Sequence, residues 1–269
     1  MSAATEAVVS YAGPGSWQQR VHVEAVWGTH ITIDVRGEQL PEDIDALIAD
    51  GVAYLHQVDA WFSTYRVDTP ITMYRNGLIP IFRTPTVVQE VLDACRYAKT
   101  LTHGAFDPWA VKGGVDPSGY VKGWAAGQLA DRLVRAGVRN VCVNASGDIA
   151  CRGLQAEGEP WAIGIINPYD TQQIVEVVHI RDGAIATSGL YERGNHIANP
   201  RTGSREVYYD SATIVGPDAG LADALATAAL VEGPGAAAWF THLPDWSVYL
   251  IKDGQVSFFG PAFERGTAA

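Results

Sequence analysis

Two Asp-Gly pairs, each set between stretches with a strand-like pattern, constrain the fold of this chain most strongly. They begin at Asp182 and Asp253, inside the segments 173–189 and 246–260. Asp-Gly favours the two-residue turns that join neighbouring antiparallel strands, so both segments are predicted to be hairpins. A sheet that contains such hairpins is not purely parallel. Because helix-like segments are interspersed among the strands, the sequence predicts a mixed α/β fold of the α+β class.

The remaining segments continue this mixture. Apolar residues at helical spacing predict helices that begin near Pro41 and near Thr86, with Thr86 as a possible cap, whereas residues 67–77 have the pattern of a loop. The other expected elements are two strands around Gly28 within 21–35, a helix over 122–136, strands over 140–144, 160–166 and 211–216, and a helix over 220–233. No linker divides the chain, so we expect one domain over residues 20–265 behind a flexible tail of residues 1–19.

Composition limits the size of the core and the kinds of partner. The 269 residues are 47% hydrophobic, which is enough for a large core in one domain or two closely packed lobes. The net charge of −11 argues against nucleic-acid binding, and it requires any anionic ligand to be held by local groups or a metal. No apolar run is long enough to span a membrane, and residues 1–20 lack the features of a signal peptide. We therefore expect a cytoplasmic protein.

The stretch 114–150 has the outline of a phosphate site. A loop rich in glycine and proline leads into a helix with Lys122 in its first turn, and a strand follows that ends in Asn-Ala-Ser-Gly-Asp. The loop matches neither a Walker motif nor a dinucleotide-binding Gly-x-Gly-x-x-Gly motif. A helix N-terminus favours an anion, and a lysine is otherwise disfavoured there. Lys122 and Gly119 are thus candidates for anion binding, with a surface lysine beside a helix cap as the alternative.

Two further pairs of residues are candidates for a site. Asp223 and Thr227 are four residues apart in an expected helix, so they share one face and offer oxygen ligands suited to Mg²⁺. The alternative is an aspartate that balances the helix dipole and a threonine bonded to its own turn. Phe106 and Asp107 precede a proline, where they either hold a ring with N–H donors or form a buried aromatic residue and a turn.

A polar loop over 186–203 gathers Thr187, Ser188, His196 and Arg201 among several glycines. Loops of this kind often carry function, although a lone histidine in one is commonly structural or solvated. The chain contains neither a Gly-x-Ser-x-Gly elbow nor a His-Glu-x-x-His motif, which argues against serine hydrolases and zinc proteases of those types.

Eight motifs in a fixed order resemble those of one family, the ApbE-type FAD:protein FMN transferases, over about three-quarters of the chain. The motifs are Gly-Thr at 28–29, the Tyr, Pro, Thr and Arg-Asn segment at 62–77, Gly-Ala-Phe-Asp-Pro at 104–108, Ser-Gly-Tyr-Val-Lys-Gly at 118–123, Val-Asn-Ala-Ser-Gly-Asp-Ile at 143–149, Thr-Ser-Gly at 187–189, His-Ile-Ala-Asn-Pro-Arg-Thr-Gly at 196–203 and Ala-Asp-Ala-Leu-Ala-Thr at 222–227. Ser118, Ser146 and Asn199 depart from the family pattern.

The resemblance implies one ApbE-like domain of two closely packed α/β lobes with FAD in the cleft between them. It implies Mg²⁺-dependent transfer of FMN from FAD to a Ser or Thr hydroxyl of an acceptor protein, with release of AMP. An FAD diphosphatase and a non-catalytic FAD-binding protein are the alternatives. The residues implied are FAD contacts at Tyr65, Ala105, Phe106, Asp107, Gly119, Lys122, Thr187, Ser188 and His196, Mg²⁺ ligands at Asp223, Thr227 and the carbonyls of Gly119 and Ala226, and His196 or Asp223 as the catalytic base.

Overall fold

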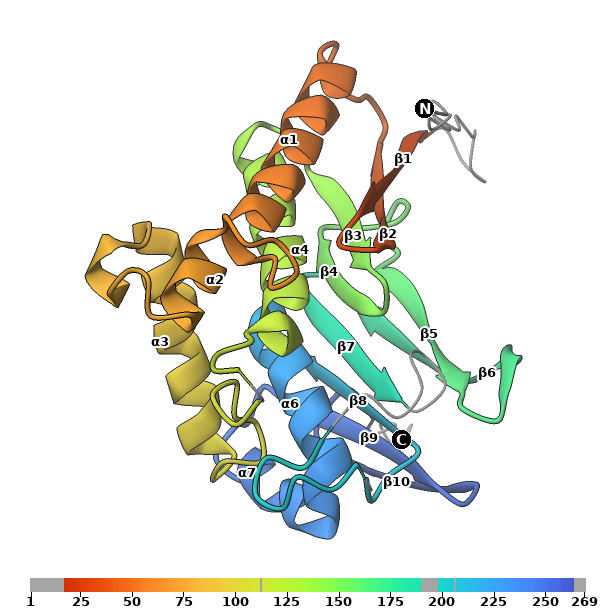
Figure 1. Ribbon diagram of the computed structural model, residues 1–269. Coiled ribbons are helices and arrows are strands. Elements are labelled where there is room, and N and C mark those ends of the chain that lie inside the picture. The colour runs from red at the N-terminus through yellow and green to blue at the C-terminus, as the bar shows by residue number, and fades with distance from the viewer. Residues whose placement is uncertain (1–16, 112, 190–197, 206, 264–269) are drawn as a thin grey trace.

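A computed structural model describes residues 17–111, 113–189, 198–205 and 207–263 (Figure 1). Its centre is an eight-stranded sheet of order β1-β2-β3-β4-β7-β8-β9-β10, in which every neighbouring pair is antiparallel. The strands are β1 (Gln18–Val26), β2 (Thr29–Gly37), β3 (Asn140–Ala145), β4 (Asp148–Arg152), β7 (Gly183–Gly189), β8 (Ser211–Gly216), β9 (Ser247–Lys252) and β10 (Gln255–Phe259). The predicted α+β class is therefore confirmed, and the main sheet is continuous from β1 to β10.

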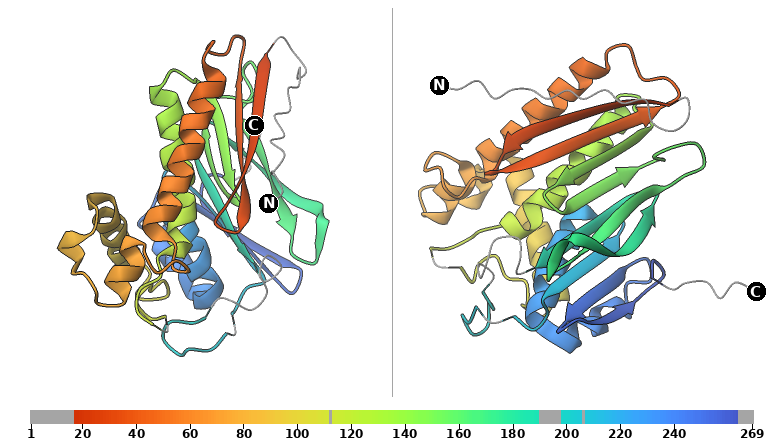
Figure 2. Two further views of the ribbon diagram at one scale, coloured as in Figure 1. Left: turned by 45° about the horizontal axis from the view of Figure 1, so that its top comes forward. Right: turned by 90° about the vertical axis from the view of Figure 1, so that its right-hand side faces the viewer.

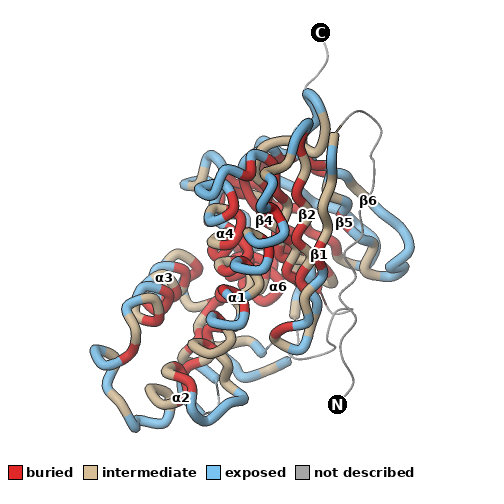
Figure 3. The backbone as a smooth tube through the Cα atoms, turned by 90° about the horizontal axis from the view of Figure 1, so that it is seen from above, coloured by how far each residue is buried: buried red, intermediate tan, exposed pale blue. Residues whose placement is uncertain are grey.

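Helices cover one face of this sheet (Figure 1). They are α1 (Ile44–Phe62), α4 (Ser118–Arg135) and α6 (Ala219–Glu232) beside the sheet, with α3 (Thr86–Leu101) against α4 and α6, and the short α2 (Pro70–Arg75), α7 (Ala237–Phe240), η1 (Ile81–Arg83) and η2 (Gly233–Ala236). The main core lies between these helices and the sheet, and Figure 3 shows buried positions gathered there. Among the described residues, no helix is both long enough and apolar enough to cross a membrane.

A two-stranded ribbon, β5 (Trp161–Asn167) and β6 (Asp170–Ile180), lies over the other face (Figure 2). A second and smaller core lies between the ribbon and the sheet. Its buried members are Cys151, Trp161, Ile165, Val178, Ile180, Ile185, Tyr249, Ile251 and Phe263. The sheet thus has two differently covered faces, which we call the helix face and the ribbon face.

The predicted hairpin over 173–189 is wrong in its pairing, although both of its strands exist. β6 pairs with β5, whereas β7 pairs with β4 and β8 in the main sheet. The side chain of Asp182 instead accepts a hydrogen bond of 3.0 Å from the N–H of Gly153, which ties the connection to the end of β4. An alternating pattern identifies strands, but it does not identify the partner of each strand.

The closing hairpin is confirmed, as are the two strands around Gly28. Asp253 and Gly254 have φ angles of 49° and 74°, the left-handed pair that a type I′ turn between β9 and β10 requires. Trp27 and Gly28, with φ of 57° and 72°, form the corresponding turn between β1 and β2.

Four local predictions need correction. Residues 67–77 are not only a loop, because α2 forms within them, with the Thr69 side chain accepting the N–H of Thr72 at its start. Thr86 is not a cap but the first residue of α3, and the capping position belongs to Pro85. α4 begins four residues earlier than expected, at Ser118. β1 also begins inside the expected tail, of which residues 1–16 lie outside the described part of the chain.

Candidate active site

The first turns of α4 and α6 meet at one end of the sheet because Gly123 carries no side chain. A Cβ atom at Gly123 would lie 2.1 Å from the carbonyl oxygen of Ala219 and 3.0 Å from the Cβ of Asp223. The N–H of Gly123 donates a hydrogen bond of 3.2 Å to Oδ2 of Asp223. This close approach makes Lys122 and Asp223 neighbours, although they are far apart in the sequence.

Lys122 forms a salt bridge with Asp148, the first residue of β4. Its Nζ also lies 3.9 Å from Oδ1 of Asp223. Asp148 follows a turn that is left-handed at Ser146 and Gly147, with φ of 58° and 97°. A hydrogen bond of 2.9 Å from Thr29 Oγ1 to Ser146 Oγ joins this turn to β2. The Gly-Thr motif therefore supports the turn that positions the partner of the lysine.

The two carboxylates are almost fully buried, with side chains only 3% exposed, whereas the Lys122 side chain is 24% exposed. Charges at such depth are stable only when they are paired and hydrogen-bonded. In this cluster one lysine faces two carboxylates. The amine can contact an anion only from its exposed side, and the carboxylates would attract a divalent cation.

The predicted metal ligands lie next to this cluster, on the helix face. Thr227 follows Asp223 by one turn of α6, and its Oγ1 is 3.2 Å from Oγ of Ser188 on β7. A Cβ placed on Gly119 would lie 3.7 Å from the same Oγ1, so the start of α4 is also close. These oxygen donors fit Mg²⁺, which commonly takes few protein ligands and completes its shell with water and phosphate.

Within the described ranges, no three His, Cys, Asp or Glu side chains gather into a metal cluster. A metal beside Asp223 would therefore depend on hydroxyl, carbonyl and ligand oxygens in addition to the one carboxylate. Ala226 is buried inside α6, and its role as a carbonyl ligand stays a prediction.

The negative charge of Asp223 reaches the core behind the site. Burial raises the pKa of the Cys95 thiol on α3, and the carboxylate of Asp223 raises it further. Burial likewise raises the pKa of the Tyr120 hydroxyl, to which Asp218, Cys95 and Asp223 add. Both groups stay neutral at physiological pH and add no charge to the region around Asp223.

The Gly-Ala-Phe-Asp-Pro motif leads to the same end of the sheet. Ala105 and Phe106 are buried, and Phe106 donates its N–H to Oγ1 of Thr102 at 3.0 Å. A Cβ on Gly119 would lie 3.4 Å from the Phe106 ring, which connects the motif to the start of α4. Asp107 accepts the N–H of Trp109 at 2.9 Å and faces Lys99 Nζ at 2.7 Å.

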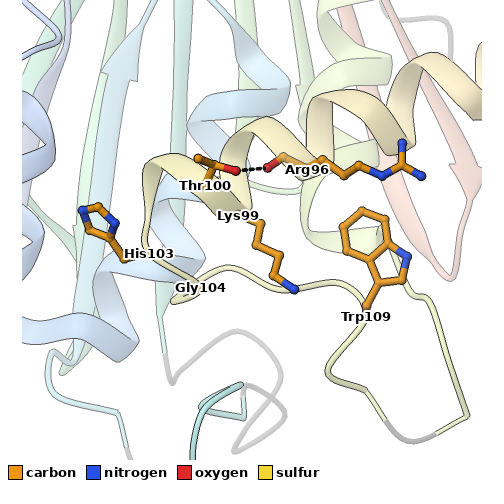
Figure 4. A pocket seen from close by; sticks show the side chains of 6 residues that line it. All are labelled: Arg96, Lys99, Thr100, His103, Gly104 and Trp109. Atoms are coloured by element: carbon orange, nitrogen blue, oxygen red, sulfur yellow. Dashed lines mark hydrogen bonds between the residues drawn. The ribbon is translucent and has the colours of Figure 1, made fainter.

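An open hollow of about 600 Å³ lies on the outer side of this motif (Figure 4). It is lined by Arg96, Lys99, Thr100, His103, Gly104 and Trp109. Arg96 and Lys99 lie over the Trp109 ring, with their charged groups 5.4 and 5.8 Å from its centroid. Both cations already have carboxylate partners, in Asp93 and Asp107.

Thr187 and Ser188 alternate on β7 and therefore serve opposite faces. Ser188 points to Thr227 on the helix face, whereas Thr187 pairs with Thr213 Oγ1 at 2.9 Å and lines a cavity on the ribbon face. This cavity has a volume of about 450 Å³ and also includes Lys122 among its lining residues. Lys122 thus lies where the two faces meet at the end of the sheet.

Tyr65 and His196 are the remaining predicted site residues. Tyr65 lies between α1 and α2 with 96% of its surface exposed. His196 lies outside the described residues, so both its proposed contact with FAD and its role as a base stay predictions.

The sequence alone predicts no role for Asp148 and none for the ribbon. The signal for Asp148 is its place at the end of the Asn-Ala-Ser-Gly-Asp stretch that follows the Lys122 helix. The cavity residues on β5 and β6, such as Ile166 and Thr171, carry no motif. The β5–β6 pairing that brings them to Lys122 is not encoded in the local pattern.

Fold and site together define a mixed α/β protein in which a half-buried lysine faces two buried carboxylates at the end of the sheet. The sequence profile of the ApbE family matches residues 110–250, and the chain belongs to this family.

Relatives and solved structures agree with this assignment. The chain is 33% identical over 166 residues to a Vibrio cholerae protein named FAD:protein FMN transferase, covering 56% of this chain and 49% of the relative. It is 34% identical over 152 residues to an Escherichia coli (strain K12) protein of the same name, covering 52% and 43%. The chain thus spans about half the length of the curated relatives it matches.

In fold, the chain is similar to the flavin transferase ApbE from Vibrio cholerae, with a TM-score of 0.79, 24% identity and coverage of 92% and 98%. It is also similar to the ApbE protein from Thermotoga maritima, with a TM-score of 0.78, 20% identity and coverage of 89% and 96%.

Proposed function

We propose that this protein transfers FMN from FAD to a Ser or Thr hydroxyl of an acceptor protein in a Mg²⁺-dependent reaction that releases AMP. The observation that carries the proposal is the half-buried Lys122 facing the buried Asp148 and Asp223, with Thr227 beside them. The relatives named FAD:protein FMN transferase support the substrate and the protein acceptor.

Each residue of the cluster has a distinct role in this proposal. Lys122 binds the FAD diphosphate as a compact positive charge, and Asp148 orients the lysine amine. Asp223, Thr227 and the carbonyl of Gly119 would hold Mg²⁺, which supplies charge neutralisation to the diphosphate when bound. Phe106 and Asp107 bind the flavin half, and His196 or Asp223 accepts the proton of the acceptor hydroxyl.

The reaction conserves its atoms and charges. The acceptor oxygen forms a bond to the phosphorus of the FMN half, while the bond from that phosphorus to the oxygen bridging it to AMP breaks. AMP leaves with the electron pair of the broken bond, and the hydroxyl proton is lost to the base. Enzymes commonly remove roughly 8–23 kcal/mol from barriers of this kind, and charge neutralisation at the phosphates is a main source of that gain.

Product analysis tests the proposal. The protein is incubated with FAD, with and without Mg²⁺, in the presence of threonine- and serine-containing peptides, and AMP, free FMN and flavin-labelled peptide are quantified. Equal amounts of AMP and labelled peptide, both dependent on Mg²⁺, are expected. AMP with free FMN alone would identify a diphosphatase, and bound but intact FAD would identify a binding protein.

A further inference from the structure

The cavity on the ribbon face is lined by apolar and hydroxyl side chains, whereas the helix face beside Lys122 carries the carboxylate of Asp223. Its walls include Ile163 and Ile166 from β5, and hydroxyl groups come from Ser146, Thr171 and Thr187. Lys122 is its one charged lining residue among the described part of the chain. Such a surface suits a neutral ligand that has both apolar and hydrogen-bonding groups and that reaches toward the lysine.

A β-bulge in the ribbon shapes this cavity. Ile166 pairs with Ile174, but the next residue on β5, Asn167, pairs with Asp170, so residues 171–173 on β6 have no counterpart. Bulges re-aim side chains and often lie beside active sites. Here Thr171 from the bulge and Ile166 opposite it both line the cavity, whereas Gln172 does not.

The geometry of phosphoryl transfer gives the cavity a role. The attacking and leaving oxygens stand roughly in line on opposite sides of the phosphorus. The metal candidates Asp223 and Thr227 lie on the helix face, and Lys122 stands at the boundary between the faces. A diphosphate held by Lys122 would border the ribbon-face cavity, because Lys122 also lines that cavity.

We propose that this cavity binds an extended, Ser- or Thr-bearing segment of the acceptor protein and presents its hydroxyl to the phosphorus beside Lys122, an inference that rests on the proposed function. Apart from Lys122, the lining matches the neutral backbone and side chains of such a segment. Among the described strands β5 pairs only with β6. Apart from the Ala162 N–H, which donates to Gln155 Oε1 at 3.3 Å, its other edge offers backbone N–H and C=O groups to an added strand. The acceptor oxygen gains the FMN phosphorus, AMP leaves with the electrons of the broken bond, and the hydroxyl proton is lost to a base and then to solvent.

Two substitutions in the same bulge provide a matched test. Thr171→Trp fills the cavity, whereas Gln172→Trp adds the same bulk at an exposed neighbouring position that does not line it. Each variant is given FAD, Mg²⁺ and a pool of short synthetic peptides with a central threonine between randomised residues. Peptide labelling should fall at least about tenfold in Thr171→Trp and stay within about twofold of wild type in Gln172→Trp. FAD affinity, measured by flavin fluorescence, should stay within about twofold in both.

A second variant guards against a local folding defect. Ile166→Gln adds no bulk and changes a side chain that is 37% exposed, so it should also reduce labelling while preserving FAD affinity. Unchanged labelling in Thr171→Trp would overturn the proposal. Weakened FAD binding in Thr171→Trp would assign the cavity to part of FAD and would also overturn it. Wild-type protein that binds FAD with Mg²⁺ but labels no peptide would instead contradict the proposed function itself.

Discussion

The two faces of the central sheet carry different side chains at the end where Lys122 lies. On the helix face, close helix packing at Gly123 and the buried Asp223 form a rigid site for charged groups. On the ribbon face, a bulged pair of strands leaves a cavity lined mainly by isoleucine and hydroxyl side chains. Lys122 lies at the boundary of both. Under the proposed function, the helix face would bind the charged nucleotide and the ribbon face the neutral polypeptide, with the reaction where the faces meet.

The largest effect is expected on the helix face. Asp223→Asn keeps the size of the side chain but removes the charge that would hold Mg²⁺, so AMP release should fall at least about a hundredfold. Rates of AMP formation at saturating FAD measure this change, and the Mg²⁺ concentration for half-maximal rate should rise. Asp218→Asn is the control, since Asp218 caps the same helix through the N–H of Leu221 without facing Lys122. Equal losses in both variants would contradict the assignment.

Variants of Lys122 distinguish two roles of its positive charge, which are stabilising the fold and binding FAD. Lys122→Met removes the cation that faces two buried carboxylates, so the free energy of unfolding should fall by about 3–5 kcal/mol. The double variant Lys122→Met with Asp148→Asn should recover most of that loss, because one buried charge is removed as well. FAD affinity should stay at least about tenfold weaker in both variants. Calorimetric titration and chemical denaturation distinguish the two effects, and full FAD affinity in the double variant would exclude Lys122 from the diphosphate site.

The close approach of α4 and α6 is tested by two glycines of one helix. Gly123→Ala forces a methyl group against the Ala219 carbonyl and should cost about 1–3 kcal/mol of stability. A Cβ at Gly127 would lie 3.4 Å from the Cβ of Ala219, which is ordinary contact, so Gly127→Ala should be neutral or stabilising by about 0.5–1 kcal/mol. Similar unfolding midpoints for the two variants would show that the helices do not depend on this contact.

The loss of stability per pH unit from a single buried acid at alkaline pH should be the smallest effect, and each face contributes such groups. Burial raises the pKa of Cys95 above its ordinary 9.0 on the helix face and raises that of Tyr54 to about 12. On the ribbon face, a hydrogen bond with Cys142 and then burial raise the pKa of Cys151. The folded protein keeps these protons when the unfolded chain has lost them. Stability is therefore complete below about pH 9 and falls as the pH rises further, by at most about 1.4 kcal/mol per pH unit for each group.

Denaturation between pH 7 and 11 measures this decline. Cys95→Ala and Cys151→Ala should each flatten it, the first through the helix-face core and the second through the ribbon-face core. A slope that neither substitution changes would assign the decline to other groups.

Local chemistry explains which parts of the fold were predictable. The Asp253-Gly254 turn, the strands around Gly28 and the helix containing Asp223 each follow from patterns within a few residues. The partner of β6 does not, because Asp182-Gly183 has the composition of a hairpin turn and yet connects two different sheets. Strand pairing at that point is decided by burial of Trp161 and Ile165 against the main sheet, which no local pattern encodes.

Some site residues were likewise predictable and others were not. The order of the motifs predicts Gly119, Lys122, Asp223 and Thr227, and the structure places them together at one end of the sheet. Asp148 was visible only as the end of a strand, since its pairing with Lys122 depends on the packing of α4 against β4. The cavity on the ribbon face depends on a bulge in strands without any motif, so only the folded chain reveals it.

The most direct test of nucleotide binding on one face and acceptor binding on the other compares Asp223→Asn with Thr171→Trp. FAD affinity in the presence of Mg²⁺ and flavin labelling of peptide are measured for both variants. We predict that Asp223→Asn loses Mg²⁺-dependent FAD affinity together with labelling, whereas Thr171→Trp loses labelling alone. If both variants lost FAD affinity to the same extent, or both kept full labelling, the separation of nucleotide and acceptor between the two faces would be contradicted.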